Sequence, residues 1–219
     1  MLILSDDMFK EEDMKKLKTG TTTIGLLAKD AVILGAERKA TMGYLVASKM
    51  TKKILKIDEH IAMSIAGVVG DAQALDRYIK AELKLFKLHE NKRPTVKAAS
   101  HLMANILYGR RFYPFIVQLI VGGYDKGGPG LFSLEPDGSI IEEKEYFSSG
   151  SGCPMAFGVL EDNYKPGMGT EEAKRLVARA INAAIKRDIA SGGSGIDITV
   201  IDAKGFHELS DEEVQKLLK

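Results

Sequence analysis

The sequence predicts an α+β fold, in which two antiparallel sheets lie face to face between layers of helices, as a four-layer αββα sandwich. The expected elements run in the order hairpins, helix pair, strands, helix pair, strand and helix, so helices and strands are grouped rather than alternating. The expected helices carry apolar stripes, and two stacked sheets with helices outside would bury all of them. No internal repeat or interdomain linker interrupts the 219 residues, which are enough for one domain with a large core.

Two β-hairpins and a pair of helices are predicted in the first half of the chain. Short apolar runs around charged turns place the hairpin strands at residues 22–27 and 31–36, and at residues 53–57 and 61–67. Asp71 is expected to cap a helix that continues to about residue 89, because apolar residues recur there every three or four positions. A second apolar stripe predicts a helix over residues 94–109, so the two helices should form an αα-hairpin.

The second half is predicted to hold further strands around another pair of helices. Residues 115–121 are too apolar for anything but a central strand, and residues 125–130 are expected to form a loop. Thr170 is expected to cap a long helix that ends near residue 188, and Ser210 begins a capping box for a last short helix. The other expected elements are strands at residues 131–134, 139–141, 196–201 and around 206, and a helix at residues 154–163.

The composition excludes several classes of function. A net charge of +1, from 31 basic and 30 acidic residues, gives no bulk attraction for nucleic acid or an anionic membrane. The single cysteine, Cys153, allows no internal disulfide and is interpreted as a small buried side chain. The four histidines lack the spacing of a metal site, so neither a metal nor another cofactor is expected. The leader, Met1–Gly20, fits no secretory or transit signal and no run is long enough for a membrane span, which predicts a cytoplasmic protein.

The stretch from Lys18 to Gly25 places a glycine before three threonines and an apolar strand. Cleavage after Gly20 would leave Thr21 with a hydroxyl and a free α-amine on the same residue. An amine with an ordinary pKa of about 7.7–8.0 is a suitable base for this weakly acidic hydroxyl. Gly20 would tolerate the backbone angles and the close approach that attack by its neighbour requires. The simpler interpretation of this octapeptide alone is a threonine-rich edge strand after a leader.

Other active-site motifs fail on single residues. A phosphate-binding loop beginning at Gly20 would need lysine where Leu26 stands. The sequence Lys18-Thr19-Gly20 matches a box of the penicillin-binding enzymes, but no serine in the chain has lysine three residues later. The tract Ser148–Gly152 lacks the first glycine of a Gly-x-Ser-x-Gly nucleophile elbow.

A set of short motifs carries a family resemblance. In chain order they are Thr21-Thr22-Thr23-Ile24-Gly25, Lys52-Lys53, Ile65-Ala66-Gly67-Val68-Val69-Gly70-Asp71, Gly150-Ser151-Gly152, Lys186-Arg187-Asp188 and Ser191-Gly192-Gly193. Each motif is weak alone, but the ordered set resembles the β subunits of the proteasome core particle, of the archaeal type, from Thr21 to about Leu218. The resemblance implies an N-terminal nucleophile hydrolase fold, with residues 1–20 as a propeptide removed by self-cleavage and residues 21–219 as one catalytic domain.

The resemblance also implies roles for single residues. Thr21 would be the nucleophile, with Lys53 as the neighbouring cation and Glu37 as the ion-pair partner of Lys53, where many relatives have aspartate. Gly67 would offer its backbone N–H to the developing oxyanion. The other implied site residues are Ser151, Asp188 and Ser191 around the amine, Thr41 and Val69 along the peptide main chain, and Ile65 and Met50 as apolar walls of the substrate pocket. For Met50, a place in the core is the alternative.

By resemblance the chain would be a threonine endopeptidase that degrades unfolded polypeptides. It would form seven-membered rings of β subunits, stacked on rings of α subunits to which an ATPase unfoldase docks. One alternative is a bacterial-type threonine protease ring paired with an unfoldase, although the tract from Lys186 to Gly193 favours the proteasome. The other is a non-maturing ring subunit or an α-type scaffold. An α-type chain should lack Thr21 and Lys53 and carry an N-terminal helix, for which the leader shows no apolar stripe.

Overall fold

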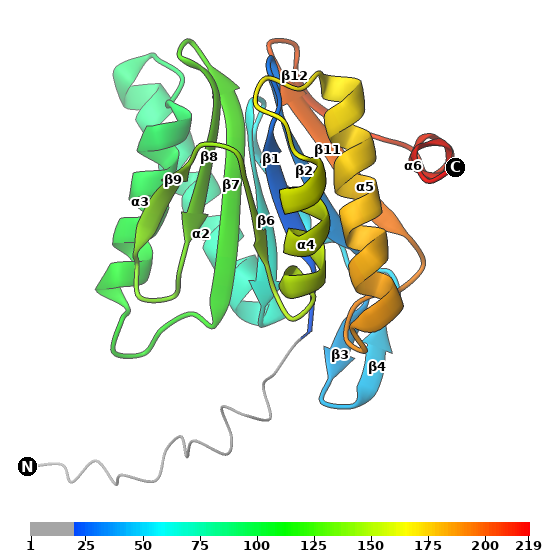
Figure 1. The fold of residues 1–219 in the computed structure, drawn as a ribbon. Helices are drawn as coiled ribbons and strands as arrows, with labels where there is room; N and C mark the ends of the chain where they lie inside the picture. Colours follow the sequence, from blue (N-terminus) through cyan, green and yellow to red (C-terminus); the bar gives the residue numbers. More distant parts are fainter. Residues whose placement is uncertain (1–19) are drawn as a thin grey trace, which may run out of the picture.

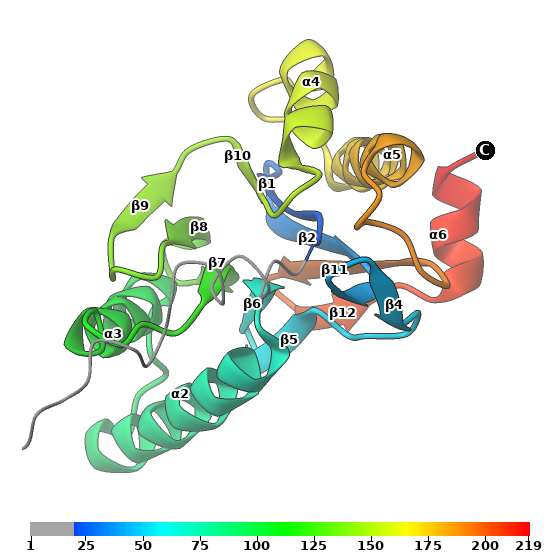
Figure 2. The ribbon, with the colours of Figure 1, turned by 90° about the horizontal axis from the view of Figure 1, so that it is seen from below.

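The computed structural model of the chain describes residues 20–219. These residues form four layers, in which two antiparallel sheets are stacked between helices on either side (Figure 1 and Figure 2). The predicted α+β sandwich is therefore confirmed. Residues 1–19 of the predicted propeptide lie outside the described residues, so Gly20 and Thr21 are the part of the predicted cleavage site on which the structure bears.

The first sheet has five strands in the order β10-β1-β2-β11-β12, and all neighbours are antiparallel. Its strands are β1 (Thr23–Leu27), β2 (Ala31–Glu37), β10 (Tyr146–Ser149), β11 (Ile196–Asp202) and β12 (Gly205–Glu208). The β1–β2 hairpin and the strand β11 match the prediction. The short strand β10 was not predicted, because its two serines resemble the small-residue tract that follows it.

The second sheet has the strand order β5-β6-β7-β8-β9, again with antiparallel neighbours. Its strands are β5 (Ile54–Asp58), β6 (Ile61–Gly67), β7 (Val117–Asp125), β8 (Gly128–Leu134) and β9 (Ile140–Glu143). β7 is the central strand, as its apolar composition predicted. The loop predicted at residues 125–130 is instead a tight turn, because Gly128 adopts a φ of +94° that lets β8 begin at once.

A third, two-stranded hairpin projects from one end of the molecule (Figure 1). It consists of β3 (Ala40–Met42) and β4 (Leu45–Ser48), with Gly43 at a φ of +59° in the turn. This hairpin was not predicted from the sequence. Its strands are short and most of their side chains are exposed, so they carry no alternation of buried and exposed residues.

Two pairs of helices cover the outer faces of the sheets (Figure 1). α2 (Val69–Glu90) and α3 (Val96–Gly109) lie on the second sheet, α4 (Cys153–Asn163) and α5 (Thr170–Arg187) lie on the first, and α6 (Asp211–Leu217) lies beside α5. The capping box of Ser210 and Glu213 at the start of α6 is confirmed.

Two predicted helix caps are wrong. Asp71 lies in the first turn of α2, after the N-cap Val68, and its carboxylate accepts the Ile116 N–H at 2.8 Å. Thr170 is the first residue of α5 rather than its cap, which is Gly169. In both cases the polar residue lies one to three positions inside the helix, where acidic or hydroxyl side chains are also common.

Three apolar clusters fill the spaces between the layers. Along β2, Ala31 and Ile33 face the helices α4 and α5, whereas Val32, Leu34 and Ala36 face the other sheet. Because successive side chains of a strand point to opposite faces of the sheet, β2 contributes to both apolar clusters. α2 and α3 close the remaining core over β6 and β7 with the side chains Ala72, Leu75, Ile79, Leu83, Ala99, Met103 and Leu107.

Antiparallel pairing brings four strand ends together at one end of the sandwich. Thr23 pairs with Ala36, so the start of β1 lies beside the end of β2. Ile54 pairs with Ser64, so the start of β5 lies near the end of β6. Thr21, Glu37, Lys53 and Gly67 come immediately before or at these four ends, although they are far apart in the sequence.

Candidate active site

Thr21 lies just before β1 and is 3% exposed. Its Oγ1 atom donates a hydrogen bond to the carbonyl oxygen of Gly20 at 2.6 Å, and its backbone N–H donates to Ser151 Oγ at 3.2 Å. The carbonyl oxygen of Thr21 accepts the Gly152 N–H at 3.2 Å, which fixes the residue from the other side. The hydroxyl thus lies beside the peptide bond that would be cut, and the nitrogen that cleavage would free faces Ser151.

Lys53 and Glu37 form a buried ion pair in the same site. Lys53 Nζ also donates to the carbonyl oxygen of Lys39 at 2.6 Å. Glu37 is fully buried and accepts three further hydrogen bonds. The Lys39 and Gly192 N–H groups bond to Oε2 at 2.7 and 2.9 Å, and the Thr22 N–H bonds to Oε1 at 3.3 Å, beside Lys53. Burial lowers the pKa of Lys53, and the negative charge of Glu37 opposes that shift.

Ser151, Asp188 and Ser191 form one hydrogen-bonded group. Asp188 Oδ2 accepts from Ser151 Oγ and from Ser191 Oγ, each at 2.6 Å. Ser151 Oγ is therefore free to accept the Thr21 N–H, because its own proton is directed to the carboxylate. Ser191 Oγ lies 2.6 Å from Thr22 Oγ1, and since the Ser191 proton goes to Asp188, Thr22 is the donor of that bond.

Gly20 fits closely against the segment that carries Asp188. A Cβ atom at Gly20 would lie 1.7 Å from the Ala190 Cβ and 3.0 Å from Ser151 Oγ. Gly20 is not among the glycines with a positive φ, so this structure does not require glycine here for its backbone angles. What glycine provides at this position is space.

Gly67, by contrast, does need its backbone freedom. Its φ is +139°, and a Cβ atom there would lie 2.2 Å from the carbonyl oxygen of Ile116. This residue ends β6 and lines the same cavity as Thr21. The backbone of Gly67 therefore borders the cavity beside Thr21, and its oxyanion contact stays a prediction.

A cavity of about 310 Å³ opens beside Thr21. Of the predicted substrate contacts, Ile65, Thr41 and Val69 line it, and Thr41 Oγ1 accepts the Gly20 N–H at 3.3 Å. The other wall residues were not predicted from the sequence, and they are Ala40, Thr51, Lys52, Leu55, Ala72 and Gln73. They come from β3, β5, α2 and the segment before β5, so they share no local sequence pattern that could have indicated them.

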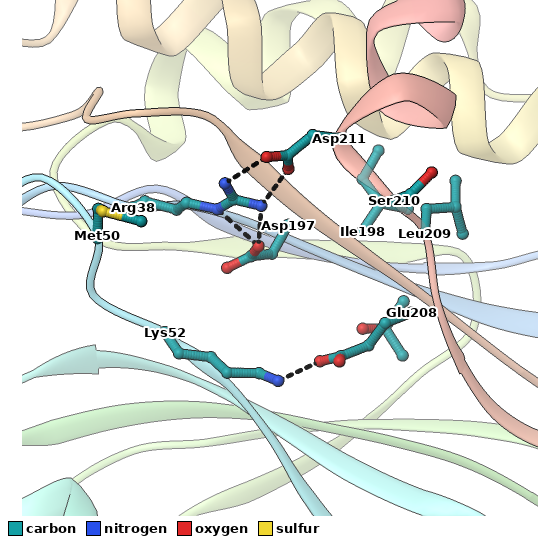
Figure 3. Close-up of a pocket in the computed structure, with 10 residues that line it drawn as sticks. Arg38, Met50, Lys52, Asp197, Ile198, Glu208, Leu209, Ser210 and Asp211 are labelled. Atoms are coloured by element: carbon teal, nitrogen blue, oxygen red, sulfur yellow. Dashed lines mark hydrogen bonds and ion pairs between the residues drawn. The ribbon is translucent and has the colours of Figure 1, made fainter.

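Met50 does not line this cavity, and it is not in the core either, because it is 75% exposed. The Thr51 N–H bonds to the carbonyl oxygen of Arg38, which brings Thr51 rather than Met50 to the cavity. Met50 instead lies at a second cavity of about 300 Å³ (Figure 3). There the guanidinium of Arg38 contacts Asp197 and Asp211, and Lys52 pairs with Glu208.

Three further observations concern the described part of the chain. Cys153 is half-buried rather than buried, and burial raises the pKa of its thiol. Among residues 20–219, no three His, Cys, Asp or Glu side chains are grouped as a metal site would require. None of the helices in these residues is long and apolar enough to cross a membrane.

Comparison with known proteins identifies the family. The family model described as "Proteasome subunit" matches residues 17–201. A protein named proteasome subunit beta from Ferroglobus placidus is 48% identical over 204 residues, which are 93% of this chain and 97% of the relative. A relative with the same name from Methanothermobacter thermautotrophicus is 48% identical over 94% of this chain and 98% of its own length. Another, from Archaeoglobus fulgidus, is 46% identical over 93% of this chain and 95% of its own length.

The four-layer sandwich and these matches define an N-terminal nucleophile hydrolase of the proteasome type. The chain belongs to the proteasome subunit family, and within it to the β subunits. It is a threonine endopeptidase subunit of the proteasome core, and the alternatives of an α-type scaffold or a bacterial-type protease are not favoured.

Proposed function

We propose that Thr21 is the nucleophile of this threonine endopeptidase, and that residues 1–20 are removed to free its α-amine. The observation that carries this proposal is the placement of both reactive atoms of Thr21. Oγ1 lies 2.6 Å from the carbonyl oxygen of Gly20, and the nitrogen lies 3.2 Å from Ser151 Oγ, beside a cavity that also contains Lys53.

In peptide hydrolysis the freed amine of Thr21 accepts the proton of Oγ1 as the oxygen attacks the substrate carbonyl carbon. Ser151, which is held by Asp188, orients that amine by hydrogen bonding. Lys53 favours the negative charge that develops on Oγ1, and Gly67 contributes its backbone N–H to the oxyanion. The C–N bond of the substrate then breaks, the amine returns its proton to the leaving nitrogen, and water hydrolyses the ester on Thr21.

Self-cleavage after Gly20 uses the same hydroxyl on a different carbonyl. Oγ1 of Thr21 attacks the carbonyl carbon of Gly20 and loses its proton, which ends on the departing Thr21 nitrogen as the Gly20–Thr21 C–N bond breaks. Water then opens the ester between Gly20 and Thr21 Oγ1, which releases residues 1–20 with a free carboxyl group. The α-amine cannot be the base in this reaction, because its nitrogen is still part of the peptide bond. The leader residues 1–19 lie outside the described residues, so this proposal rests on Gly20, Thr21 and their contacts.

As a proteasome subunit the chain assembles with other proteasome subunits. We propose that it forms seven-membered rings stacked on rings of α subunits, and that an ATPase unfoldase docks on the α rings and supplies unfolded polypeptides. A cytoplasmic location is part of the same proposal. The family membership supports this assembly, and the number of subunits in a ring is measured by native mass spectrometry.

The proposed function is tested by the mass and N-terminal residue of the chain after assembly with its α subunits. The wild-type chain should begin at Thr21 and hydrolyse fluorogenic peptides. Thr21→Ser retains a hydroxyl and should still be processed, whereas Thr21→Ala should keep residues 1–20 and have no peptidase activity. Removal of the leader from the Thr21→Ala chain in protease-free solution would show that Thr21 does not cut its own chain.

A further inference from the structure

Lys39 follows Glu37 by two residues and lies between β2 and β3, outside the cavity wall. We infer that Lys39 is a positioning residue of the active site, whose side chain anchors the segment Asp188–Gly193 to the end of the strand that carries Glu37. The inference rests on the proposed function, since its consequence is the placement of groups around Thr21.

The contacts of Lys39 join the two halves of the site. Its Nζ donates to the carbonyl oxygen of Ile189 at 2.8 Å. Its backbone carbonyl accepts Lys53 Nζ at 2.6 Å, and its backbone N–H bonds to Glu37 Oε2 at 2.7 Å. One residue therefore contacts the Lys53–Glu37 pair through its main chain and the Asp188 segment through its side chain.

The anchored segment makes the contacts on which the chemistry at Thr21 depends. Asp188 holds Ser151 and Ser191, and the Cβ of Ala190 occupies the space next to Gly20. A shift of this segment would move both the partner of the Thr21 nitrogen and the surface behind Gly20. Misplacement of reacting groups by about 1 Å can cost about 100-fold in rate, so an anchor here has a direct effect on turnover.

The first half of the segment is otherwise held by Asp188, whose carboxylate accepts the Ala190 N–H at 3.2 Å and the hydroxyl groups of Ser151 and Ser191. The side chain of Ile189 is 82% exposed, so it contributes little packing. The second half contains Gly192 and Gly193, with φ angles of +140° and +94°, and it is held by its backbone: Gly192 O accepts the Arg38 and Lys39 N–H groups at 3.0 Å. The ammonium of Lys39 extends this attachment to Ile189, directly before Ala190.

The neighbouring cation Arg38 does not share this role. Its guanidinium forms ion pairs with Asp197 and with Asp211, the first residue of α6, at the second cavity (Figure 3). Two successive basic residues thus point to different parts of the molecule. Lys49 is another lysine near this segment, because its carbonyl oxygen accepts the Ser194 N–H at 2.8 Å. Its side chain, however, has no hydrogen-bond or ion-pair partner among residues 20–219. Lys49 is therefore a matched control.

Lys39 also acts on the charges of the site. Lys53 is faced by the carboxylates of Glu37 and Asp188 and by the ammonium of Lys39. Removing the Lys39 charge removes one cause that lowers the pKa of Lys53. The alkaline limb of the pH dependence of kcat, where Lys53 loses its charge, should then move to higher pH, which a loss of structure alone would not produce.

The test compares Lys39→Met, Lys39→Arg and Lys49→Met in fully assembled, processed particles. Lys39→Met should lower kcat about 10- to 100-fold with KM nearly unchanged, and the alkaline limb of its pH dependence should move to higher pH. Lys39→Arg keeps a cation and a donor, so it should restore the pH profile and most of kcat. Lys49→Met should behave as the wild type.

Several results would overturn the inference. They are a wild-type kcat for Lys39→Met, an equal loss for Lys49→Met, or a loss of kcat with an unmoved alkaline limb. If Lys39→Met does not assemble, Lys39→Gln is measured by the same criteria, and failure of both to assemble would assign Lys39 a structural role instead. Labelling of Thr21 by a peptide electrophile separates this inference from the proposed function. An unlabelled wild-type Thr21 contradicts the proposed function, whereas labelling of Lys39→Met at the wild-type rate contradicts only the role of Lys39.

Discussion

Lys53 and Glu37 form an ion pair in which the side chains are 7% and 0% exposed, at the meeting point of β2 and β5. A compact ammonium is needed there, because Lys53 Nζ contacts both a carboxylate oxygen and the carbonyl oxygen of Lys39. Such a buried pair is costly to disturb, since removing one partner would leave an uncompensated buried charge. We therefore expect the site to require lysine, rather than another cation, at position 53.

Lys53→Arg should lower kcat by orders of magnitude while assembly persists. The substitution keeps the charge, but a planar guanidinium cannot occupy the space of an ammonium that is enclosed on several sides. The measurement is peptide hydrolysis by assembled particles, with Lys56→Arg as control because Lys56 lies on β5 in an exposed ion pair with Glu59. Wild-type turnover in an assembled Lys53→Arg particle would contradict the proposed role of Lys53.

Cleavage should follow apolar or aromatic residues, with a broad preference. The cavity beside Thr21 is walled by Ile65, Leu55, Val69 and Ala72, and the cations Lys52 and Lys53 also line it. A difference of one methylene in such a pocket discriminates by only about 1–3 kcal/mol, so Leu and Tyr should both be accepted. Fluorogenic peptides ending in Leu, Tyr, Arg and Glu provide the measurement. A clear preference for Arg or Glu would show that the pocket is not used as an apolar one.

The parts of the fold that could be predicted are those with many residues in one pattern. The apolar stripe of α2 predicts a helix and the apolar run of β7 predicts a buried strand, because the neighbouring layer buries these side chains. The strands of the β3–β4 hairpin and β10 were missed, since short strands with exposed or small side chains have no comparable pattern. Helix starts at Asp71 and Thr170 were misplaced because a polar residue near an end fits several positions.

The candidate site could be predicted only in part from local sequence. The spacing of Thr21, Lys53 and Asp188 in the sequence does not predict that they share a site, because strand pairing and the end of α5 bring them together. Only the family resemblance predicted that these residues belong to one site. Met50 was misplaced because the chain turns after β4 and directs Thr51 to the cavity. Thr22 and Lys39 were overlooked because their roles depend on contacts with Ser191 and Ile189, far along the chain.

Lys87→Met should destabilise the protein at neutral pH, and the effect should shrink in acid. Burial raises the pKa of Asp58, but the hydrogen bond from Lys87, the Glu59 N–H and the charge of His60 together lower it below its ordinary value of 3.8. A carboxylate with a lowered pKa contributes stability above pH 3.8 that is lost as the pH falls through the folded-state pKa. Without Lys87, the buried Asp58 loses its ion-pair partner, at a cost of about 1–3 kcal/mol.

The measurement for Lys87→Met is the unfolding temperature of the assembled protein at neutral pH and at successively lower pH, until Asp58 is protonated. Lys144→Met is the control, because its partner Glu142 is exposed and such pairs contribute about 0–1 kcal/mol. The difference between the two variants should be clear at neutral pH and small in acid. An equal effect of Lys87→Met at neutral pH and in acid would contradict the role assigned to its pair with Asp58.

Gly20→Ala should slow removal of the leader. A Cβ atom at position 20 would meet the Ala190 Cβ at 1.7 Å and Ser151 Oγ at 3.0 Å, so the residue must shift away from the hydroxyl that would attack it. The processed chain begins at Thr21 and is the same as the wild type, so activity per cleaved subunit should not change. Intact mass during assembly with α subunits measures the rate of processing.

Ala190→Gly provides the decisive second variant, because it removes the methyl group that a Cβ at position 20 would meet. In the double variant Gly20→Ala with Ala190→Gly, processing should recover toward the wild-type rate. Ala190→Gly alone should process normally, apart from any effect of a more flexible segment next to Asp188. Processing of Gly20→Ala at the wild-type rate would show that the contact with Ala190 does not control the scissile bond. A slow single variant that Ala190→Gly leaves equally slow would place the obstacle at Ser151 instead, whose Oγ lies 3.0 Å from the same Cβ position.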